Sequence, residues 1–170
     1  PTSPHYRCSR SLSTATTLNG SVIDSRWNIP IVNARVSLDG MPPVKVDDGK
    51  YVFHPIAPGS YRLTAHGPYH HEVEAKVHVT AKDRWIELSL DPVFTEQELY
   101  DFAAIIRAEA EGEPYIGQVA VAASILNRWR SPDFPDNLTD IIYQVIAGYY
   151  QYSPVLDGRI NLGPNASAWK

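Results

Sequence analysis

The sequence predicts a multidomain β + α protein in which a β-sandwich is followed by an α-helical domain. Between Leu18 and Leu90, apolar and polar residues alternate in short runs with the period of a strand, whereas from Thr95 onward the apolar residues recur with the 3.6-residue period of a helix. The charge changes at the same place, because residues 1–93 hold 10 Lys and Arg against 9 Asp and Glu, and residues 94–170 hold 5 against 10. We therefore expect the two domains to join at residues 91–93.

The composition of the 170 residues argues against several classes of protein. Hydrophobic residues make up 44% and charged residues 20%, which is ordinary globular composition. No apolar run approaches the roughly 20 residues that cross a bilayer, so no membrane span is expected. The net charge is −4 and there is no basic stripe, so nucleic acid is not an expected partner. The single cysteine, Cys8, cannot form an internal disulfide.

The first 17 residues are expected to form an N-terminal arm. They are rich in Ser, Thr and Pro, carry no periodic pattern and lack the apolar core of a signal peptide. Pro1 is what remains when the initiator Met is removed from Met-Pro, so it is a candidate for the true start; the alternative is that the chain is a fragment.

Residues 18–91 carry about seven short strand patterns separated by turn residues, which predicts an all-β sandwich. Asp48-Gly49 is expected to make a hairpin turn, and Pro58-Gly59 a corner before the strand that carries Tyr61. The strand patterns cover residues 21–23, 31–38, 44–46, 51–53, 61–65, 73–79 and 85–90.

The motifs of this module resemble a known family. Gly20-Ser-Val-Ile-Asp, Pro30-Ile-Val-Asn-Ala-Arg-Val, Asp48-Gly-Lys-Tyr-Val-Phe and Ala57-Pro-Gly-Ser-Tyr-Arg-Leu are similar to the carboxypeptidase regulatory-like (transthyretin-like) β-sandwich family, which has an Ig-like architecture. The resemblance implies a docking or spacer domain that holds a protein assembly partner, and it does not identify that partner.

Three histidines in the β module allow two interpretations. His66, His70 and His71 could form a metal cluster or could lie in a surface loop. No cysteine accompanies them and no regular spacing aims the three imidazoles at one point, so the surface loop is preferred and no metal is expected.

A helix start signal follows the join. Thr95 is placed as the N-cap, Glu98 completes a capping box, and Phe94 and Leu99 are spaced for a hydrophobic staple. Gly112 is expected to end the helix. At about 100° per residue, one face is apolar and consists of Leu99, Phe102, Ala103, Ile106 and Ala110. The next helix is rich in small apolar residues between Ala120 and Leu126, and we interpret these as core.

Glu109 lies at the edge of that apolar face, with Glu111 and Glu113 close by in sequence. Burial and like charges both disfavour the ionised form of a carboxyl group, and the protonated form is what a general acid needs. The alternative is a solvated or capping glutamate at a helix end.

The helical module resembles a second family. Residues 107–128 read Arg-Ala-Glu-Ala-Glu-Gly-Glu-Pro-Tyr-Ile-Gly-Gln-Val-Ala-Val-Ala-Ala-Ser-Ile-Leu-Asn-Arg, and further matching segments follow in order. Over residues 95–170 the chain is similar to the SleB-type (spore cortex-lytic) cell-wall hydrolases. The resemblance implies a lysozyme-like α-helical fold, the glycan strand of peptidoglycan as substrate and Glu109 as the catalytic residue.

The chain departs from that family in two places. The family usually has Arg where this chain has Glu111, which should add negative charge near Glu109. An insertion-like Val-Ile-Ala-Gly-Tyr-Tyr at residues 145–150 is expected to reshape a wall of the substrate groove.

The mechanism that the resemblance implies needs one carboxylic acid. Glu109 would protonate the glycosidic oxygen between N-acetylmuramic acid and N-acetylglucosamine, and then accept the proton of the muramic C6 hydroxyl as it attacks the anomeric carbon. The product of this lytic transglycosylase would be a 1,6-anhydro sugar. Hydrolysis would require a second carboxylate. Asp140 and Asp157 are the candidates, but we expect the first in an early helical turn and the second in an Asp-Gly turn.

Six further side chains offer the aromatic faces, amides and hydroxyls that sugar rings require, although ordinary packing or capping is the alternative for each. These candidate substrate-binding residues are Tyr115, Gln118, Tyr143, Gln144, Tyr152 and Ser153. No cofactor and no metal is called for.

The sequence therefore predicts a bacteriolytic glycosidase that acts on peptidoglycan, as a lytic transglycosylase or a muramidase-like hydrolase. Because no export signal is visible, we expect either a phage tail-associated lysozyme carried in the virion or another route to the periplasm and cell wall. The competing hypothesis is a non-catalytic structural or glycan-binding component docked on a larger assembly, such as a phage baseplate. The family continues beyond the residues matched by Pro164-Asn-Ala, so Lys170 is expected to be a truncated end, or a neighbour supplies the missing groove wall.

Overall fold

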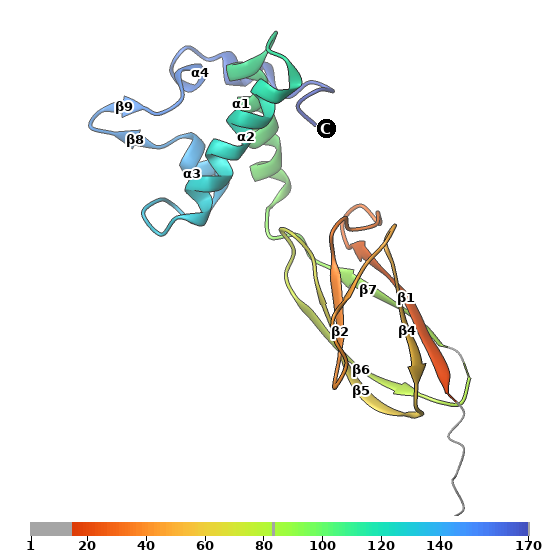
Figure 1. Cartoon of the computed structure of the whole chain (residues 1–170). Coiled ribbons are helices and arrows are strands. Elements are labelled where there is room, and N and C mark those ends of the chain that lie inside the picture. The colour runs from red at the N-terminus through yellow and green to blue at the C-terminus, as the bar shows by residue number, and fades with distance from the viewer. Residues whose placement is uncertain (1–14, 83, 170) are drawn as a thin grey trace, which may run out of the picture. The chain divides into compact units, whose positions relative to one another are not determined.

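The computed structural model describes residues 15–82 and 84–169. The chain forms two compact units, Pro1–Val93 and Phe94–Lys170, each with its own buried residues (Figure 1). Cys8 and most of the predicted N-terminal arm lie outside the described residues. The arm is shorter than predicted, since Thr16 and Thr17 already belong to the first strand.

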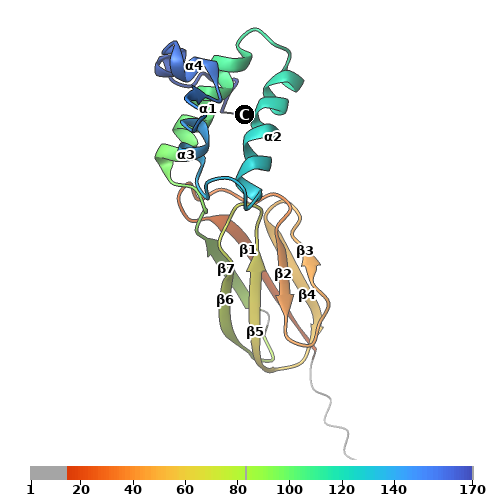
Figure 2. The same ribbon diagram turned by 90° about the vertical axis from the view of Figure 1, so that its left-hand side faces the viewer.

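The first unit is the predicted β-sandwich. Its described residues form a three-stranded sheet in the order β4-β1-β7 and a four-stranded sheet in the order β3-β2-β5-β6 (Figure 2). In the first sheet, β1 pairs with β4 in antiparallel and with β7 in parallel orientation. The strands are β1 (Thr16–Asp24), β2 (Arg35–Leu38), β3 (Val44–Lys45), β4 (Lys50–Ile56), β5 (Gly59–His66), β6 (Val73–Val79) and β7 (Arg84–Leu90).

The alternating pattern puts every second side chain of these strands into one core. In β4, Tyr51 and Phe53 are buried and Val52 is exposed, which is the predicted alternation. The rings of Tyr51 and Phe53 meet edge to face with their centroids 6.0 Å apart. Leu63 of β5 and Leu88 of β7 belong to the same buried cluster, so the core lies between the two sheets.

The expected turn at Asp48-Gly49 is confirmed. Both residues have left-handed backbones, with φ of 45° and 71°, and the flanking Asp47 and Lys50 exchange backbone hydrogen bonds of 2.9 and 2.8 Å. A two-residue turn with two positive φ angles matches the twist of the strands that it joins.

The strand predicted over residues 31–38 is wrong in its first half. Only Arg35–Leu38 is a strand. Asn33 has a left-handed φ of 60°, which interrupts the pleat, and the preceding Val32 is 75% exposed. Ile31 and Ala34 are nonetheless buried, because the loop packs them against the core.

Among the three histidines considered for a metal cluster, His66 and His70 contact different carboxylates. His66 Nε2 lies 2.9 Å from Glu72, and His70 Nε2 lies 2.9 Å from the buried carboxylate of Asp24. His70 Nδ1 is also 2.7 Å from the Pro68 carbonyl oxygen. These two contacts of the His70 ring tie the 66–71 loop to the end of β1.

The second unit is built around one helix, α1 (Glu96–Ala110). Figure 2 shows α2 on one side of α1 and the α4 segment on the other. Phe94, just before α1, meets Trp129 near the end of α2 with ring centroids 4.8 Å apart, so α1 and α2 form an antiparallel hairpin. The remaining elements are α2 (Tyr115–Arg130), α3 (Leu138–Ile142), β8 (Val145–Ile146), β9 (Tyr149–Tyr150), α4 (Ser153–Leu156) and the 3₁₀ turn η1 (Arg159–Leu162).

The predicted ends of α1 are confirmed. The Thr95 hydroxyl accepts the Glu98 backbone N–H, and the Glu98 carboxylate accepts the Thr95 backbone N–H, which is a complete capping box. The helix ends at Ala110, and Gly112 follows with a φ of 93°.

The prediction that the small apolar residues between Ala120 and Leu126 belong to the core is only partly correct. Among the residues of α2 only Ile125 is buried, while Ala120 and Ala123 are exposed. α2 packs against α1 and α3 along one side, and no described element of this unit covers the other side. Within the described ranges, no helix combines the length and the apolar character needed to cross a membrane.

Candidate active site

Glu109 lies in the last turn of α1, on the same face of the helix as Phe102 and Ile106. Their spacings of four and three residues place the three side chains along one ridge. Glu109 is exposed, although Ala108 and Ala110 on either side of it are buried. The predicted burial of this carboxyl group is therefore wrong: the described residues cover Ala108 and Ala110 but leave the ridge exposed at Glu109.

A hollow of about 230 Å³ opens beside this ridge. It lies between α1, α2 and the segment near the C-terminus. Two of the predicted substrate-binding residues, Tyr115 and Gln118, belong to its wall, and Tyr115 is 60% exposed. The lining residues are Phe102, Ile106, Tyr115, Gln118, Val119, Ala122, Ser167 and Ala168.

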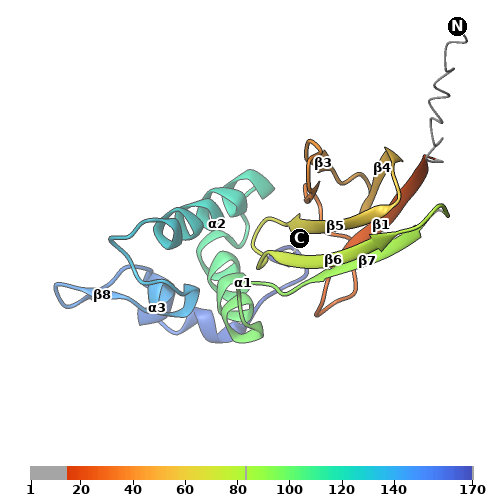
Figure 3. The same ribbon diagram turned by 90° about the horizontal axis from the view of Figure 1, so that it is seen from below.

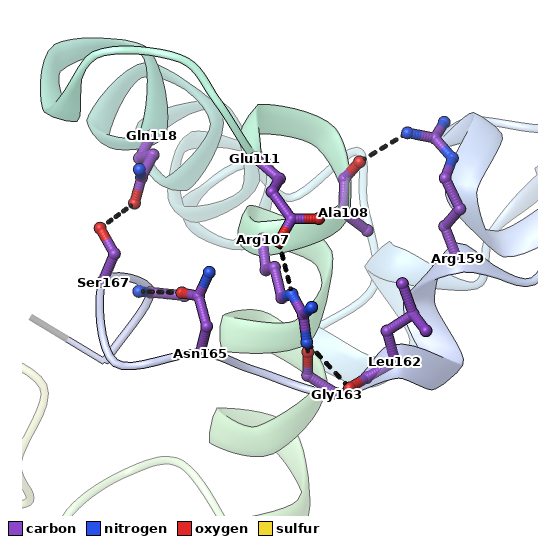
Figure 4. A network of polar contacts seen from close by, with 10 residues as sticks. Arg107, Ala108, Glu111, Gln118, Arg159, Leu162, Gly163, Asn165 and Ser167 are labelled. Atoms are coloured by element: carbon purple, nitrogen blue, oxygen red, sulfur yellow. Dashed lines mark hydrogen bonds and ion pairs between the residues drawn. The ribbon is translucent and has the colours of Figure 1, made fainter.

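Hydrogen bonds hold the third wall of the hollow in place (Figure 4). The Ser167 hydroxyl donates to Gln118 Oε1 at 2.8 Å, and Asn165 Oδ1 accepts the Ala168 backbone N–H at 3.0 Å. Because the amide oxygen of Gln118 accepts this hydrogen bond, its amide nitrogen is the donor that the side chain can offer to the hollow.

The side of α1 that faces away from Glu109 is anchored by Arg107. Its Nη1 donates to the carbonyl oxygens of Leu162 and Gly163, both at 3.0 Å, and its Nε pairs with Glu111 at 3.2 Å (Figure 4). Glu111 therefore sits beside a guanidinium on another face of the helix. The Arg107 guanidinium offsets the negative charge that Glu111 was expected to add near Glu109.

Four other predicted substrate-binding residues lie at the base of the β8–β9 hairpin. Tyr143 and Gln144 precede β8, and Tyr152 and Ser153 follow β9. The Gln151 backbone N–H donates to the Gln144 carbonyl oxygen at 3.2 Å, which brings the two ends of the hairpin together.

Glu109 lies in the second half of α1, whereas Tyr143 and Tyr152 lie near the first half of α1 and the second half of α2. Burial raises the pKa of Tyr143, and the charges of Asp101 and Tyr100 in the first half of α1 raise it further. The Tyr152 ring lies 5.1 Å from the guanidinium carbon of Arg128, in the second half of α2. The structure thus divides the six predicted residues into two groups, and only Tyr115 and Gln118 share the hollow beside the Glu109 ridge.

The hairpin base contains polar atoms whose hydrogen-bonding capacity is unused. Arg128 Nη1, Gln144 Oε1 and the Tyr152 hydroxyl are buried without a hydrogen-bond partner. Tyr152 is only 7% exposed, so its hydroxyl has lost water without a replacement. Such groups are rare in folded proteins.

The two candidate second carboxylates have structural partners. Asp140 lies in the first turn of α3, as predicted, although the N-cap is Asn137, whose side-chain nitrogen donates to Asp140 at 2.7 Å. Asp157 caps α4 and accepts from the backbone and side chain of Arg159, and these hydrogen bonds hold the pKa of its exposed carboxyl below the usual value.

Sequence reasoning did not assign roles to two residues that shape the site. Arg107 carried a detectable signal, because it stands four residues before Glu111 on one helix face. Arg159 donates to the Ala108 carbonyl oxygen at 2.8 Å. No local sequence signal indicates this contact, because 51 residues separate the two.

Residues 112–170 match the family model described as Cell Wall Hydrolase. Two curated relatives are spore cortex-lytic enzymes. The one from Halalkalibacterium halodurans is 43% identical over 75 residues, which is 44% of this chain and 22% of the relative. The one from Bacillus subtilis is 41% identical over 75 residues, which is 44% of this chain and 23% of the relative. These matches confirm the predicted relationship of the helical unit to the SleB-type hydrolases.

The chain spans only about a quarter of the length of these curated relatives. Among solved structures, a putative carbohydrate binding protein from Bacteroides uniformis is similar with a TM-score of 0.39 and 14% identity, over 46% of this chain and 42% of that chain. A likeness this weak carries no argument about function.

Proposed function

We propose that the helical unit, which matches the Cell Wall Hydrolase family over residues 112–170, cleaves the bond between N-acetylmuramic acid and N-acetylglucosamine in peptidoglycan, with Glu109 as the single acid and base. The observation that carries the proposal is the exposed Glu109 carboxyl on the ridge of Phe102 and Ile106, which line the hollow next to Tyr115 and Gln118.

Each part of this arrangement has a task in the proposed reaction. The apolar ridge and the Tyr115 ring offer surfaces for the apolar faces of pyranose rings, and the Gln118 amide nitrogen offers a donor. Arg107 and Arg159 tie the last turn of α1 to the η1 segment, which fixes the backbone that carries Glu109. A sugar strand laid across the ridge would shield the carboxyl group from water and favour its protonated form.

Glu109 then gives its proton to the glycosidic oxygen as the bond to the anomeric carbon breaks. The muramic C6 hydroxyl attacks the anomeric carbon and returns its proton to the Glu109 carboxylate, so the enzyme is regenerated and no water is consumed. We prefer this lytic transglycosylase reaction to hydrolysis because Asp140 and Asp157 are engaged with Asn137 and Arg159.

The test measures the release of soluble products from purified peptidoglycan by three proteins: the parent chain, the Glu109→Gln variant and the Glu111→Gln variant. The products are identified by mass spectrometry. Glu111→Gln is the matched control, because it removes a neighbouring carboxylate that points to Arg107. We expect anhydro-muropeptides from the parent and from Glu111→Gln, and a loss of at least about 100-fold with Glu109→Gln, since general acid catalysis contributes that much.

Other outcomes are equally informative. Muropeptides with reducing ends, instead of 1,6-anhydro ends, would show that the reaction is hydrolysis and not transglycosylation. Equal release by the parent and Glu109→Gln would remove Glu109 from the mechanism. Retention of the parent on peptidoglycan without cleavage would favour a glycan-binding component.

For the β-sandwich we propose a docking or spacer role, and transport in a phage tail is one form of it. This role predicts that residues 15–93 alone bind the assembly partner. Mass spectrometry of purified virions tests the phage form directly, and absence of the chain from virions would contradict it.

A further inference from the structure

The outer face of the four-stranded sheet of the β-sandwich places cations opposite one another. In the register of β5 and β6, which run side by side (Figure 3), Arg62 is paired with Lys76. Arg35 of β2 is paired in the same way with Lys45 of β3. Because the chain neighbours of all four cations pack in the core, the cations lie on the outer face. Like charges in directly opposed pairs destabilise a sheet, so two such pairs on one face indicate a use for positive charge.

Only part of this charge is neutralised. Arg62 Nε lies 3.4 Å from Glu74 Oε1, and both side chains are about half exposed. Within the described residues, no carboxylate forms an ion pair with Lys76, Arg35 or Lys45. An exposed ion pair is weak, so Glu74 does not prevent the Arg62 guanidinium from binding a second anion.

A hollow of about 340 Å³ is lined by both members of the Arg62–Lys76 pair. Ser60 and His78, the next outward-facing pair of the two strands, also line it. The Ser60 hydroxyl and His78 Nδ1 lie 3.1 Å apart. If the hydroxyl donates this hydrogen bond, the N–H at His78 Nε2 remains as a donor, and if Nδ1 donates it, the Ser60 O–H remains. The hollow therefore combines two cations with a further hydrogen-bond donor.

One carboxylate, that of Asp39, lines the same hollow. Its Oδ2 accepts the Arg62 backbone N–H at 3.1 Å, which fixes its position beside β5. Its negative charge opposes the binding of an anion. Removing this charge and removing that of Lys76 must therefore have opposite effects if the hollow binds an anion.

The surroundings of the hollow select among anions. A phosphate group offers several acceptor oxygens to Arg, Lys and neutral donors. Single-stranded nucleic acids also need aromatic platforms, but the Tyr61 ring in this hollow packs against the core of the sandwich. Lipid surfaces need exposed apolar side chains, and the large exposed apolar residues described in the sandwich belong to the other sheet or to loops. A phosphate on a small hydrophilic carrier fits best.

We propose that the hollow binds the phosphate groups of a polyol phosphate polymer, in which short polyols are joined by phosphodiesters. Arg35 pairs with His66 of β5, four residues from Arg62, so the second cation pair lies about 14 Å along the sheet. A second phosphate of the same chain reaches that pair, which a free phosphate ion cannot do. The inference rests on the docking role proposed for the β-sandwich and names the chemistry of its partner.

The experiment titrates the full chain with inorganic phosphate and, separately, with a glycerol phosphate oligomer, and records ¹H–¹⁵N NMR spectra. We expect both probes to shift the amide signals of residues 60–62 and 76–78. The oligomer should bind at least about tenfold more tightly than phosphate, because it engages both cation pairs. Lys76→Gln should weaken the binding of both probes about threefold, as the loss of one exposed ion pair does. Asp39→Asn should strengthen it about twofold, because it removes the opposing charge.

Two further variants locate the effect. Lys50→Gln makes the same change in net charge on β4 of the other sheet and should leave the binding of both probes unchanged. Arg35→Gln should weaken the binding of the oligomer and leave that of inorganic phosphate unchanged. Melting temperatures equal to that of the parent show that the variants are folded.

Equal affinities of the parent, Lys76→Gln and Lys50→Gln would overturn the proposal. So would tighter binding of duplex DNA or phosphatidylglycerol vesicles than of the oligomer through these residues. Cleavage of peptidoglycan by Glu109 and the presence of the chain in purified virions are measured separately. If neither probe binds but the chain is found in virions, the docking role stands and this inference falls. If the oligomer binds through the hollow and the chain is absent from virions, the inference stands and the phage form of docking falls.

Discussion

The Glu98 carboxylate accepts a hydrogen bond from the Leu138 backbone N–H at 3.0 Å, although 40 residues separate them. The same carboxylate accepts the backbone N–H and the hydroxyl of Thr95, both at 2.8 Å. One side chain therefore caps the start of α1 and the start of α3. Asp101, one turn later on α1, accepts the Thr139 hydroxyl at 2.9 Å and reinforces the same junction.

Replacing Glu98 by Ala should destabilise the helical unit more than the loss of an ordinary cap. A lost cap costs about 1 kcal/mol, and the Leu138 N–H loses its partner as well, so we expect a cost of about 2–3 kcal/mol. The measurement is urea unfolding followed by far-ultraviolet circular dichroism. Glu96→Ala is the matched control, because Glu96 is exposed in the same turn and should change stability by less than about 0.5 kcal/mol. Equal effects of the two substitutions would contradict the double cap.

The same contacts predict how stability depends on pH. Burial alone would raise the pKa of Glu98, but hydrogen bonds from Thr95 and Leu138 outweigh it, against some opposition from the Asp140 charge, and the pKa lies below its usual value. A carboxyl with a lowered folded pKa contributes stability that is complete above its unfolded pKa of about 4.3 and is lost as the pH falls through the folded value.

The stability advantage of the parent over Glu98→Gln should therefore be constant between about pH 6 and 8 and should shrink as the pH is lowered through about 4. Unfolding at several pH values checks this. An advantage that stays the same at acidic pH would show that the ionised form of Glu98 is not what the cap requires.

Gly20 permits a close crossing at the centre of the three-stranded sheet. It pairs with Tyr51 in β4 and with Ile86 in β7, and the Tyr51 hydroxyl passes over it to donate to the Ile86 carbonyl oxygen at 2.9 Å. A Cβ at Gly20 would overlap both the Tyr51 ring and the Ile86 carbonyl. We expect Gly20→Ala to cost the β-sandwich about 3 kcal/mol.

Gly59→Ala is the control for this substitution. A Cβ at Gly59 meets only ordinary contacts with the Tyr61 ring. Thermal unfolding of the two variants should show a clearly lower melting temperature for Gly20→Ala alone, and comparable melting temperatures would refute the close crossing.

Local signals explain which parts of the fold were predictable. The capping box of Thr95 and Glu98 and the turn at Asp48-Gly49 each depend on residues within four positions, and both are confirmed. The alternation of β4 was readable for the same reason. The second role of Glu98 was not, because its partner Leu138 is brought near only by packing.

Burial was the weakest part of the prediction, because it depends on what lies opposite a side chain. The apolar residues of α2 resemble a core helix, but only Ile125 is buried, since the described unit has no layer against Ala120 and Ala123. Glu109 lies on the ridge of Phe102 and Ile106, yet the helix ends one residue later and no described residue buries the ridge at Glu109. The pattern of a helix indicates which face can be buried, and its neighbours decide how far along the helix that burial extends.

Arg107 should stabilise the helical unit mainly through its hydrogen bonds to backbone carbonyls and much less through its ion pair. Its Nη1 binds the carbonyl oxygens of Leu162 and Gly163, whereas Glu111, its partner at Nε, is about half exposed. Hydrogen bonds from a charged donor are worth about 1.5–3 kcal/mol each, and an exposed ion pair about 0–1 kcal/mol. We therefore expect Arg107→Met to destabilise the helical unit by about 2–3 kcal/mol and Glu111→Gln by less than about 0.5 kcal/mol. Chemical unfolding of both variants measures the two contributions separately. A larger loss of unfolding free energy with Glu111→Gln would mean that the ion pair, rather than the hydrogen bonds to the Leu162 and Gly163 carbonyls, holds the last turn of α1 in place.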